Sequence, residues 1–284
     1  MEHTKPRTKI SIKNPEFLLI GIGASLIAIH LSLFWREKDS VSVCLFILFC
    51  ANIWSLLQEK RHSLNLESGF LASTLGFLLI AFVFINSIYK INFTVLLALS
   101  PFISAVGLIL LASGFQGLKH YWLELLTISF FSLRTFIPLI QSIDISIITA
   151  KFAAILLWYT GFDISISGVI LSLPTGSVKV YSGCSGMVLI LDTLSLAVLF
   201  LCMFELSLKQ KIIVPLLAAT LAFIINAIRV CLMAILVAQG DQQAFNYWHE
   251  GDGSLLFSTI TAFIFCCFCW FILSRNQVKN QKCK

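Results

Sequence analysis

Three side chains far apart in the sequence are of types that together perform nucleophilic acyl transfer. Cys184 lies in the glycine-rich segment 181–186, Arg229 in a long apolar segment, and His249 in the polar segment 241–253, which is expected to be a loop. A thiolate is a strong nucleophile, and an imidazole can take the thiol proton and return it to a leaving amine. A guanidinium is permanently charged and offers a fixed fork of donors to an oxyanion or a carboxylate. The three types predict a cysteine-dependent acyl-transfer site.

The immediate neighbours of Cys184 favour this chemistry. Gly183 and Gly186 flank it at the point where a loop is expected to turn into a helix. A helix N-terminus stabilises a thiolate, and its backbone N–H groups can point at a developing oxyanion.

Each of the three residues also has a structural interpretation. A cysteine in a glycine-rich turn can serve packing alone, and Arg229 can extend its charged end toward lipid headgroups. His249 follows Trp248 and can be an interface residue. Catalysis is supported only by the convergence of all three on one membrane face, which depends on the elements that carry them.

The nine cysteines of the chain do not indicate a metal centre. Most lie in apolar runs, where cysteine behaves as a small hydrophobic residue. No Cys-x-x-Cys pair is joined by a second pair or by a histidine at zinc spacing. We therefore expect no metal site and no cofactor.

The composition indicates an integral membrane protein. Of the 284 residues, 58% are hydrophobic and 12% are charged, and the mean hydropathy is +0.92. A soluble domain carries about a quarter of its residues as charged groups, so a soluble enzyme is excluded.

Eight segments are long enough to cross a bilayer core, which takes about 20 apolar residues. The predicted spans are residues 17–35, 40–58, 68–89, 91–118, 121–140, 186–205, 212–239 and 254–274. The fourth is expected to bend or break near Pro101. The seventh is longer than the hydrocarbon core and must tilt, break or protrude.

The segment between the fifth and sixth spans has a different character. Residues 145–159 have apolar residues on one side and Lys151 in the middle, which is typical of an interfacial or re-entrant amphipathic helix. Residues 169–173 and 177–181 flank the turn 174–176 and predict a small β-hairpin.

The expected fold class is thus an all-α polytopic membrane protein of about eight transmembrane helices, with an amphipathic helix and a small extracytoplasmic β-hairpin before Cys184. We divide it into N-terminal transmembrane helices (residues 1–140), a transmembrane core that carries the site (141–274) and a basic cytoplasmic tail (275–284).

The distribution of charge predicts the orientation. Basic residues crowd both chain ends within a net charge of +6, and lysine and arginine beside short spans stay in the cytoplasm. Both termini are then cytoplasmic, and Cys184, Arg229 and His249 share the extracytoplasmic face. Arg229 is 17 residues into its span, about 25 Å from the inner end. The basic residues lack interleaved aromatics, so no nucleic-acid partner is expected.

Four further polar residues lie within predicted spans, where burial is costly: Glu124, Arg134, Asp192 and Asn226. Asn226 lies three residues before Arg229 on the same helix face and could be its partner. Asp192 could pair with Arg134 or Arg229, or be a structural acid. The roles of these four residues stay open at the sequence level.

Two other functions compete with acyl transfer. A transporter or flippase would use Glu124, Arg134, Asp192 and Arg229 to line a polar path. A thiol oxidoreductase would need a second cysteine on the outer face, and the expected outer loops contain none beside Cys184. The acidic residues Glu250 and Asp252 could orient the imidazole of His249 or belong to a solvated loop.

Taken in order, these motifs resemble the exosortase/archaeosortase family, most closely its cyanobacterial branch, the cyanoexosortases. The motifs are Gly183-Cys184-Ser185-Gly186, Asn226-Ala227-Ile228-Arg229 and His249-Glu250. The resemblance covers roughly residues 145–274, whereas residues 1–140 match only as several hydrophobic spans.

The resemblance implies a multi-pass enzyme of the plasma (inner) membrane that acts as a cysteine transpeptidase or protease. Its implied substrates are membrane-anchored proteins with a C-terminal sorting signal of the PEP-CTERM kind. By position, Cys184 would be the nucleophile, Arg229 the cation that stabilises the transition state or anchors substrate, and His249 the general acid/base. Any accessory domain is expected to be a separate protein. The substrates' identities, the acyl acceptor and the oligomeric state are not predicted.

Overall fold

The computed structural model of the chain describes residues 15–37, 39–60, 67–88, 94–136, 144–249, 251 and 253–282. The chain separates into two compact units, residues 1–132 and 133–284. The basic N-terminal residues that carry the orientation argument lie outside the described ranges.

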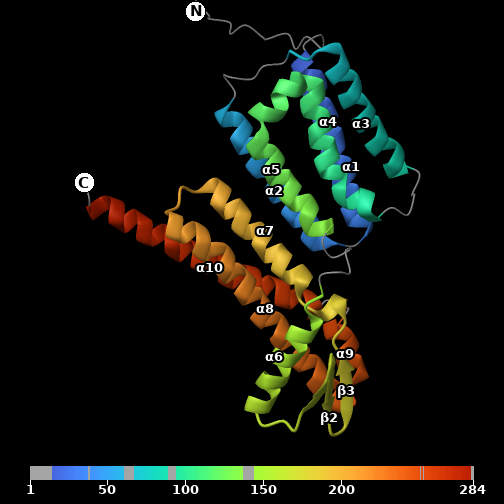
Figure 1. Cartoon of the computed structure of the whole chain (residues 1–284), viewed down its shortest axis with the longest axis vertical. Coiled ribbons are helices and arrows are strands. Elements are labelled where there is room, and N and C mark those ends of the chain that lie inside the picture. Colours follow the sequence, from blue (N-terminus) through green and yellow to red (C-terminus); the bar gives the residue numbers. More distant parts are fainter. Residues whose placement is uncertain are drawn as a thin grey trace, which may run out of the picture. The chain divides into compact units, whose positions relative to one another are not determined.

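The first unit is a bundle of apolar helices (Figure 1). Its elements are α1 (Pro15–Arg36), α2 (Ser40–Glu59), α3 (Phe70–Ile88), α4 (Thr94–His120) and the larger part of α5 (Trp122–Phe136). Helices α3 and α4 approach closely because glycines face each other, a Cβ on Gly76 lying 2.6 Å from the Gly107 carbonyl oxygen. Small residues permit such close approach where lipid supplies no hydrophobic driving force between helices.

Helix α4 breaks at Gly114, and no break occurs at Pro101; whether the helix bends there stays a prediction. Gly114 adopts φ 63° and ψ −160° inside the helix, a conformation that glycine reaches without the steric cost of a side chain. The Ser68 hydroxyl donates to the Leu110 carbonyl at 2.7 Å, one turn before the break. Pro101 is accommodated within the helix, as prolines in membrane helices are when neighbours satisfy the freed groups.

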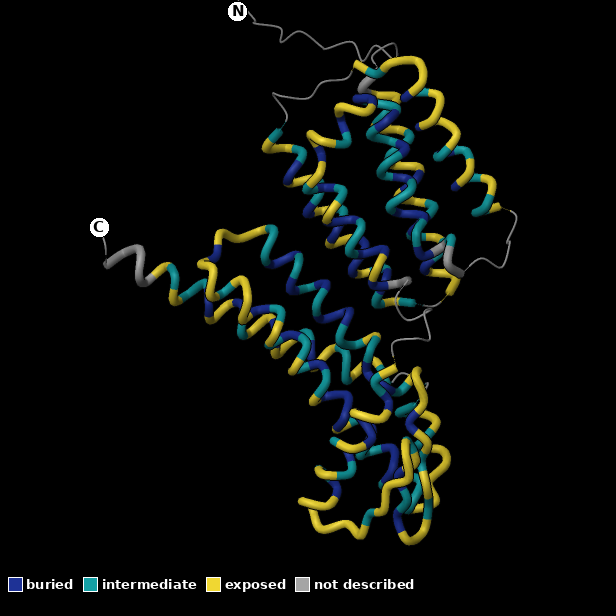
Figure 2. Tube along the Cα trace, in the orientation of Figure 1, coloured by how far each residue is buried: buried dark blue, intermediate teal, exposed yellow. Residues whose placement is uncertain are grey.

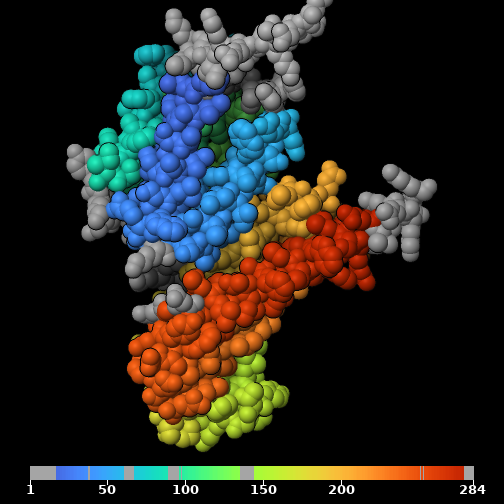
Figure 3. Space-filling view, turned by 180° about the vertical axis from the view of Figure 1, so that it is seen from behind, coloured from blue at the N-terminus to red at the C-terminus, as the bar shows by residue number. Residues whose placement is uncertain are grey.

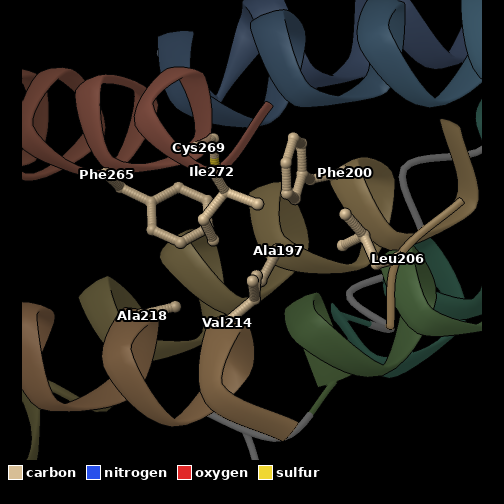
Figure 4. Close-up of a cluster of buried hydrophobic side chains, with 8 residues drawn as sticks. All are labelled: Ala197, Phe200, Leu206, Val214, Ala218, Phe265, Cys269 and Ile272. Atoms are coloured by element: carbon tan, nitrogen blue, oxygen red, sulfur yellow. The ribbon is translucent and has the colours of Figure 1, made fainter. Parts of the chain in front are cut away.

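The second unit is built on three apolar helices, α7 (Met187–Met203), α8 (Leu208–Ala238) and α10 (Gly253–Lys282). Their shared core is shown in Figure 4, where side chains from all three helices converge. The buried members are Ala197, Phe200, Leu206, Val214, Ala218, Phe265, Cys269 and Ile272. Figure 3 shows α10, in red, lying along the orange segments of the same unit.

A small sheet and a short helix cover the C-terminal half of α8 (Figure 1). The helix is α6 (Ser146–Tyr159), and the antiparallel sheet runs in the order β1 (Ser165–Ser167), β2 (Ile170–Leu173), β3 (Gly176–Lys179). The predicted hairpin is thus confirmed as β2–β3, with Leu171 opposite Val178. Strand β1 adds a third member that the sequence analysis did not predict.

The inner face of the sheet packs on α6 and α8 through small and branched residues. Leu171, Val180 and Val230 are buried with Ala150 and Ala153 of α6. The outer side of α6 carries large exposed apolar residues around Lys151, namely Ile147, Ile148, Ile155, Trp158 and Tyr159. Both sides of α6 are therefore apolar, which differs from the expected one-sided pattern. Figure 2 shows the buried and exposed sides of these elements.

The α6 helix begins beside an acidic residue. Asp144 accepts hydrogen bonds from the hydroxyl of Ser146 at 2.5 Å and from its backbone N–H at 2.9 Å. Both bonds hold the pKa of Asp144 below its ordinary value, and the bond from the hydroxyl contributes more than the bond from the backbone N–H.

Helix α8 is one continuous element of 31 residues, about 46 Å long at 1.5 Å per residue. The hairpin turn caps its far end, because the Thr175 hydroxyl donates to the Ala238 carbonyl at 2.6 Å. Of the three expected outcomes, a break does not occur. Whether the helix tilts or protrudes stays a prediction.

The segment after α8 is helical where a polar loop was expected. Helix α9 spans Gln242–His249, and the Asp241 carboxylate accepts from the Ala244 N–H at 2.9 Å as its cap. The correction matters because α9 carries His249. Glu250 and Asp252 lie outside the described residues.

Six helices in the described part of the chain are long and apolar enough to cross a membrane: 17–36, 40–59, 70–88, 98–120, 208–238 and 253–277. Eight spans were predicted, and the described residues confirm a multi-span protein but not the number eight. Helices α5 and α7 fall short with 15 and 17 residues, and residues 137–143 after α5 are outside the described ranges. The last helix continues to Lys282, so the predicted tail from residue 275 begins as helix.

A pair of glycine variants tests the α3–α4 packing. Gly76→Ala places a methyl group 2.6 Å from a backbone oxygen, and we expect a loss of about 1–3 kcal/mol in the free energy of unfolding. Gly21→Ala is the matched control, because no atom lies within 4 Å of its added Cβ. Unfolding in mixed micelles measures both. Equal stability of the two variants would contradict the packing described.

Candidate active site

Cys184 ends a single 3₁₀ turn, Ser182–Cys184, that joins the sheet to α7. Tyr181 is extended with φ −98° and ψ 173°, and its carbonyl accepts the Cys184 N–H at 2.8 Å. Gly186 then adopts φ 90° immediately before α7, a left-handed conformation that side chains rarely adopt. The glycine predicted to flank the cysteine is thus required by the backbone.

Two buried side chains from other helices hold this turn. The Asn226 amide of α8 donates to the Cys184 carbonyl at 2.9 Å, and the Thr149 hydroxyl of α6 donates to the Ser185 carbonyl at 2.7 Å. A Cβ on Gly186 would lie 2.6 Å from the Asn226 amide nitrogen, so the glycine also makes room for that bond. Asn226, expected as a partner of Arg229, instead bonds the backbone of Cys184.

His249 reaches the thiol from the end of α9. Its Nε2 lies 3.3 Å from the Cys184 Sγ, within the range of a sulfur hydrogen bond. The imidazole stacks on Phe245, one helical turn earlier, with 5.1 Å between ring centroids and 14° between planes. Both Cys184 and His249 are half-buried, so the pair is partly shielded from solvent and open on one side.

Arg229 completes the group through the backbone of His249. Its Nη2 donates to the His249 carbonyl oxygen at 2.7 Å, and the residue is half-buried. The three residues predicted from the sequence therefore meet in the structure. The contact of Arg229 is with the main chain of His249, which residue types alone could not indicate.

A fourth polar group in the site is the Tyr181 hydroxyl, which the sequence analysis did not single out. It lies 2.9 Å from the same Nε2 of His249. A 3₁₀ turn brings residues i and i+3 to one side, so the turn itself places Tyr181 beside Cys184. The sequence feature that could have identified Tyr181 is a tyrosine three residues before a cysteine in a tight turn.

Glu124, Arg134 and Asp192, the remaining charged residues noted within the predicted spans, are engaged in ion pairs. Glu124 pairs with Lys60 at 2.8 Å in the first unit, and Asp192 pairs with Arg134 at 2.6 Å in the second, both residues being buried. Of the two partners considered for Asp192, the structure selects Arg134. Within the described ranges, no group of three or more His, Cys, Asp or Glu side chains could hold a metal ion.

Fold and site together define a multi-pass helical membrane protein. It holds the thiol of Cys184, just before α7, in contact with the imidazole of His249 at the end of α9. The sequence profile described as transmembrane exosortase (Exosortase_EpsH) matches residues 35–266. That range covers most of the chain and includes Cys184, Arg229 and His249, and the chain belongs to the exosortase family. Searches of curated proteins and of solved structures gave no match.

The strained glycine before α7 gives a test of the turn. Gly186→Ala adds a methyl group that collides with Asn226 at a positive φ, and we expect a loss of about 2–4 kcal/mol in the free energy of unfolding. The control is Gly240→Ala, which has φ 74° and open space around its Cβ, and bears the backbone strain alone. If both substitutions destabilise equally, the Asn226 contact contributes nothing.

The Arg134–Asp192 pair can be tested by removing one partner or both. Asp192→Leu removes the carboxylate that pairs with the buried Arg134 guanidinium, and we expect a loss of about 3–5 kcal/mol in the free energy of unfolding. The double variant Arg134→Leu/Asp192→Leu should recover most of that loss. Additive losses in the double variant, measured by unfolding in mixed micelles, would argue against a direct pair.

Proposed function

We propose that this exosortase-family protein is a membrane-embedded cysteine transpeptidase or protease that cleaves C-terminal sorting signals of the PEP-CTERM kind. Cleavage takes place at the extracytoplasmic face of the plasma (inner) membrane through a thioester acyl-enzyme. The observation that carries the proposal is the 3.3 Å contact between the Cys184 Sγ and the His249 Nε2. A nucleophile in hydrogen-bond contact with a base that is itself held in place is the minimal arrangement for covalent catalysis.

The proton and bond changes are balanced by the two residues. His249 takes the Cys184 proton, the thiolate attacks the peptide carbonyl carbon, and the C–N bond breaks as His249 returns the proton to the leaving amine. The resulting thioester is resolved by an incoming amine, which gives transpeptidation, or by water, which gives hydrolysis. In either case the proton lost by the acceptor passes through His249 to the released thiolate.

Arg229 is proposed as the cation that stabilises the developing oxyanion or anchors substrate. The N–H groups of Cys184 and Ser185 are bonded within the turn, to the carbonyls of Tyr181 and Ser182 at 2.8 and 3.2 Å. They are therefore poorly placed to serve an oxyanion, contrary to the role expected for the turn's N–H groups. Arg229 donates one N–H to the His249 carbonyl, and a guanidinium has further N–H groups that can serve an oxyanion.

The depth of the site suits a substrate that arrives as a transmembrane tail. On α8, Arg229 follows Lys209 by 20 residues, which is about 30 Å along the axis and equals the usual hydrocarbon thickness. With the lysine at the cytoplasmic boundary, the site stands at the extracytoplasmic boundary. The scissile bond beside a spanning substrate helix then reaches Cys184 without leaving the membrane surface.

We further propose that the chain belongs to the cyanobacterial branch of the family. The support is the order and spacing of the glycine-flanked Cys184, the Asn226 to Arg229 motif and His249. The Asn226 to Arg229 motif bonds to both of the others in the structure, through Asn226 to the Cys184 carbonyl and through Arg229 to the His249 carbonyl.

The transporter alternative has less support. It would use Glu124, Arg134, Asp192 and Arg229 along a polar path, but the first is paired with Lys60 and the next two with each other. Arg229 bonds the backbone of the residue that faces the thiol. The charged groups are thus engaged in local contacts.

The proposal is tested by expressing Cys184→Ala beside a reporter that carries a C-terminal sorting signal. We expect tail cleavage to fall below about one-thousandth of the wild-type rate, because the covalent route is lost. Cys266→Ala, which removes an exposed thiol from the middle of α10, is the matched control and should cleave normally. Continued cleavage by Cys184→Ala at the wild-type rate would refute the proposed function.

A further inference from the structure

We propose that Tyr181 is a positioning residue that keeps the His249 Nε2 directed at the sulfur of Cys184 throughout the reaction cycle, an inference that rests on the proposed function. The Tyr181 hydroxyl lies 2.9 Å from Nε2, and the same nitrogen lies 3.3 Å from the Cys184 Sγ. One ring atom therefore faces two partners, both supplied by a single turn of the chain.

The His249 Nε2 cannot form full hydrogen bonds to Tyr181 and Cys184 at the same time. The nitrogen carries one lone pair when it acts as a base and one N–H when it acts as an acid, so it serves one partner fully at a time. A phenol can donate to the lone pair and can accept from the N–H. Tyr181 is thus able to bond Nε2 in both protonation states of the imidazole.

The thioester stage is where this ability matters most. Once the sulfur is acylated it carries no proton to donate and is a weak acceptor, so the Cys184–His249 hydrogen bond is lost. Phe245 stacks on the ring face and Arg229 holds the backbone carbonyl, and neither contact fixes rotation of the ring within its own plane. The Tyr181 hydroxyl supplies that restraint until an amine or water approaches.

The backbone is shaped to put the Tyr181 ring there. A Cβ on Gly183 would lie 2.7 Å from the Tyr181 Cε2, so the ring occupies the space that any side chain at 183 would fill. The ring also packs edge to face on the His249 imidazole with 5.9 Å between centroids. Tyr181 is 45% exposed, so the protein covers its side chain only in part.

The test measures the reactivity of Cys184 in the purified full-length protein and needs no substrate. Iodoacetamide alkylates the thiolate, and mass spectrometry follows the Cys184 peptide as a function of time and pH. We expect Tyr181→Phe to slow alkylation at neutral pH about fivefold, the effect of one hydrogen bond, and to move the pH midpoint upward. The reason is that a misdirected imidazole stabilises the thiolate less well. Tyr159→Phe, an equivalent loss at an exposed position on α6, should react like wild type.

A double-mutant cycle separates positioning from general damage. In a His249→Gln background, Tyr181→Phe should change the rate less than twofold, because its effect passes through the imidazole. Gly183→Ala, which displaces the Tyr181 ring, should reproduce the slower rate in a chain that retains the hydroxyl. An unchanged or faster rate in Tyr181→Phe, or a full fivefold loss in the His249→Gln background, would overturn the inference. The proposed function stands or falls separately, on tail cleavage by Cys184→Ala.

Discussion

The site depends on the hydrogen bond from the Asn226 amide to the Cys184 carbonyl. Backbone groups that are buried must find hydrogen-bond partners inside the protein. The turn that carries Cys184 is irregular, and it is satisfied from two directions by Asn226 and by Thr149 of α6. This arrangement requires glycine at position 186, because the Cβ of any other residue would collide with the Asn226 amide. The thiol is therefore positioned through its own main chain.

The same strategy appears on the opposite side of the site. Arg229 bonds the His249 carbonyl, so the imidazole is also positioned through its backbone while its ring stays available for chemistry. Asn226 and Arg229 lie one turn apart on α8, and each fixes one member of the thiol–imidazole pair. A single helix thereby sets the separation of two residues that are 65 positions apart in the sequence.

Sequence reasoning located the three central residues because it needed only residue type and topology. Charge distribution and span order placed Cys184, Arg229 and His249 on one face, and the structure brings them into contact. It failed where local signals were weak or misleading. Helix α9 is short and polar, so its sequence resembled a loop, and β1 is a three-residue, fully exposed strand. Proline is the stronger helix breaker in water, yet α4 tolerates Pro101 and breaks at Gly114. The partner of Asp192 depended on packing between helices, which no local pattern encodes.

Helix α8 has a consequence for substrate selection. It is continuous from the lysines near its start to Arg229, and Asn226 of the same helix bonds the Cys184 carbonyl. On the proposed function, the length of this helix sets the distance from the cytoplasmic membrane surface to the peptide bond that is cleaved. Selection would then act on the length of the substrate's apolar segment as well as on its sequence. A tail of mismatched length would present its scissile bond above or below the thiol.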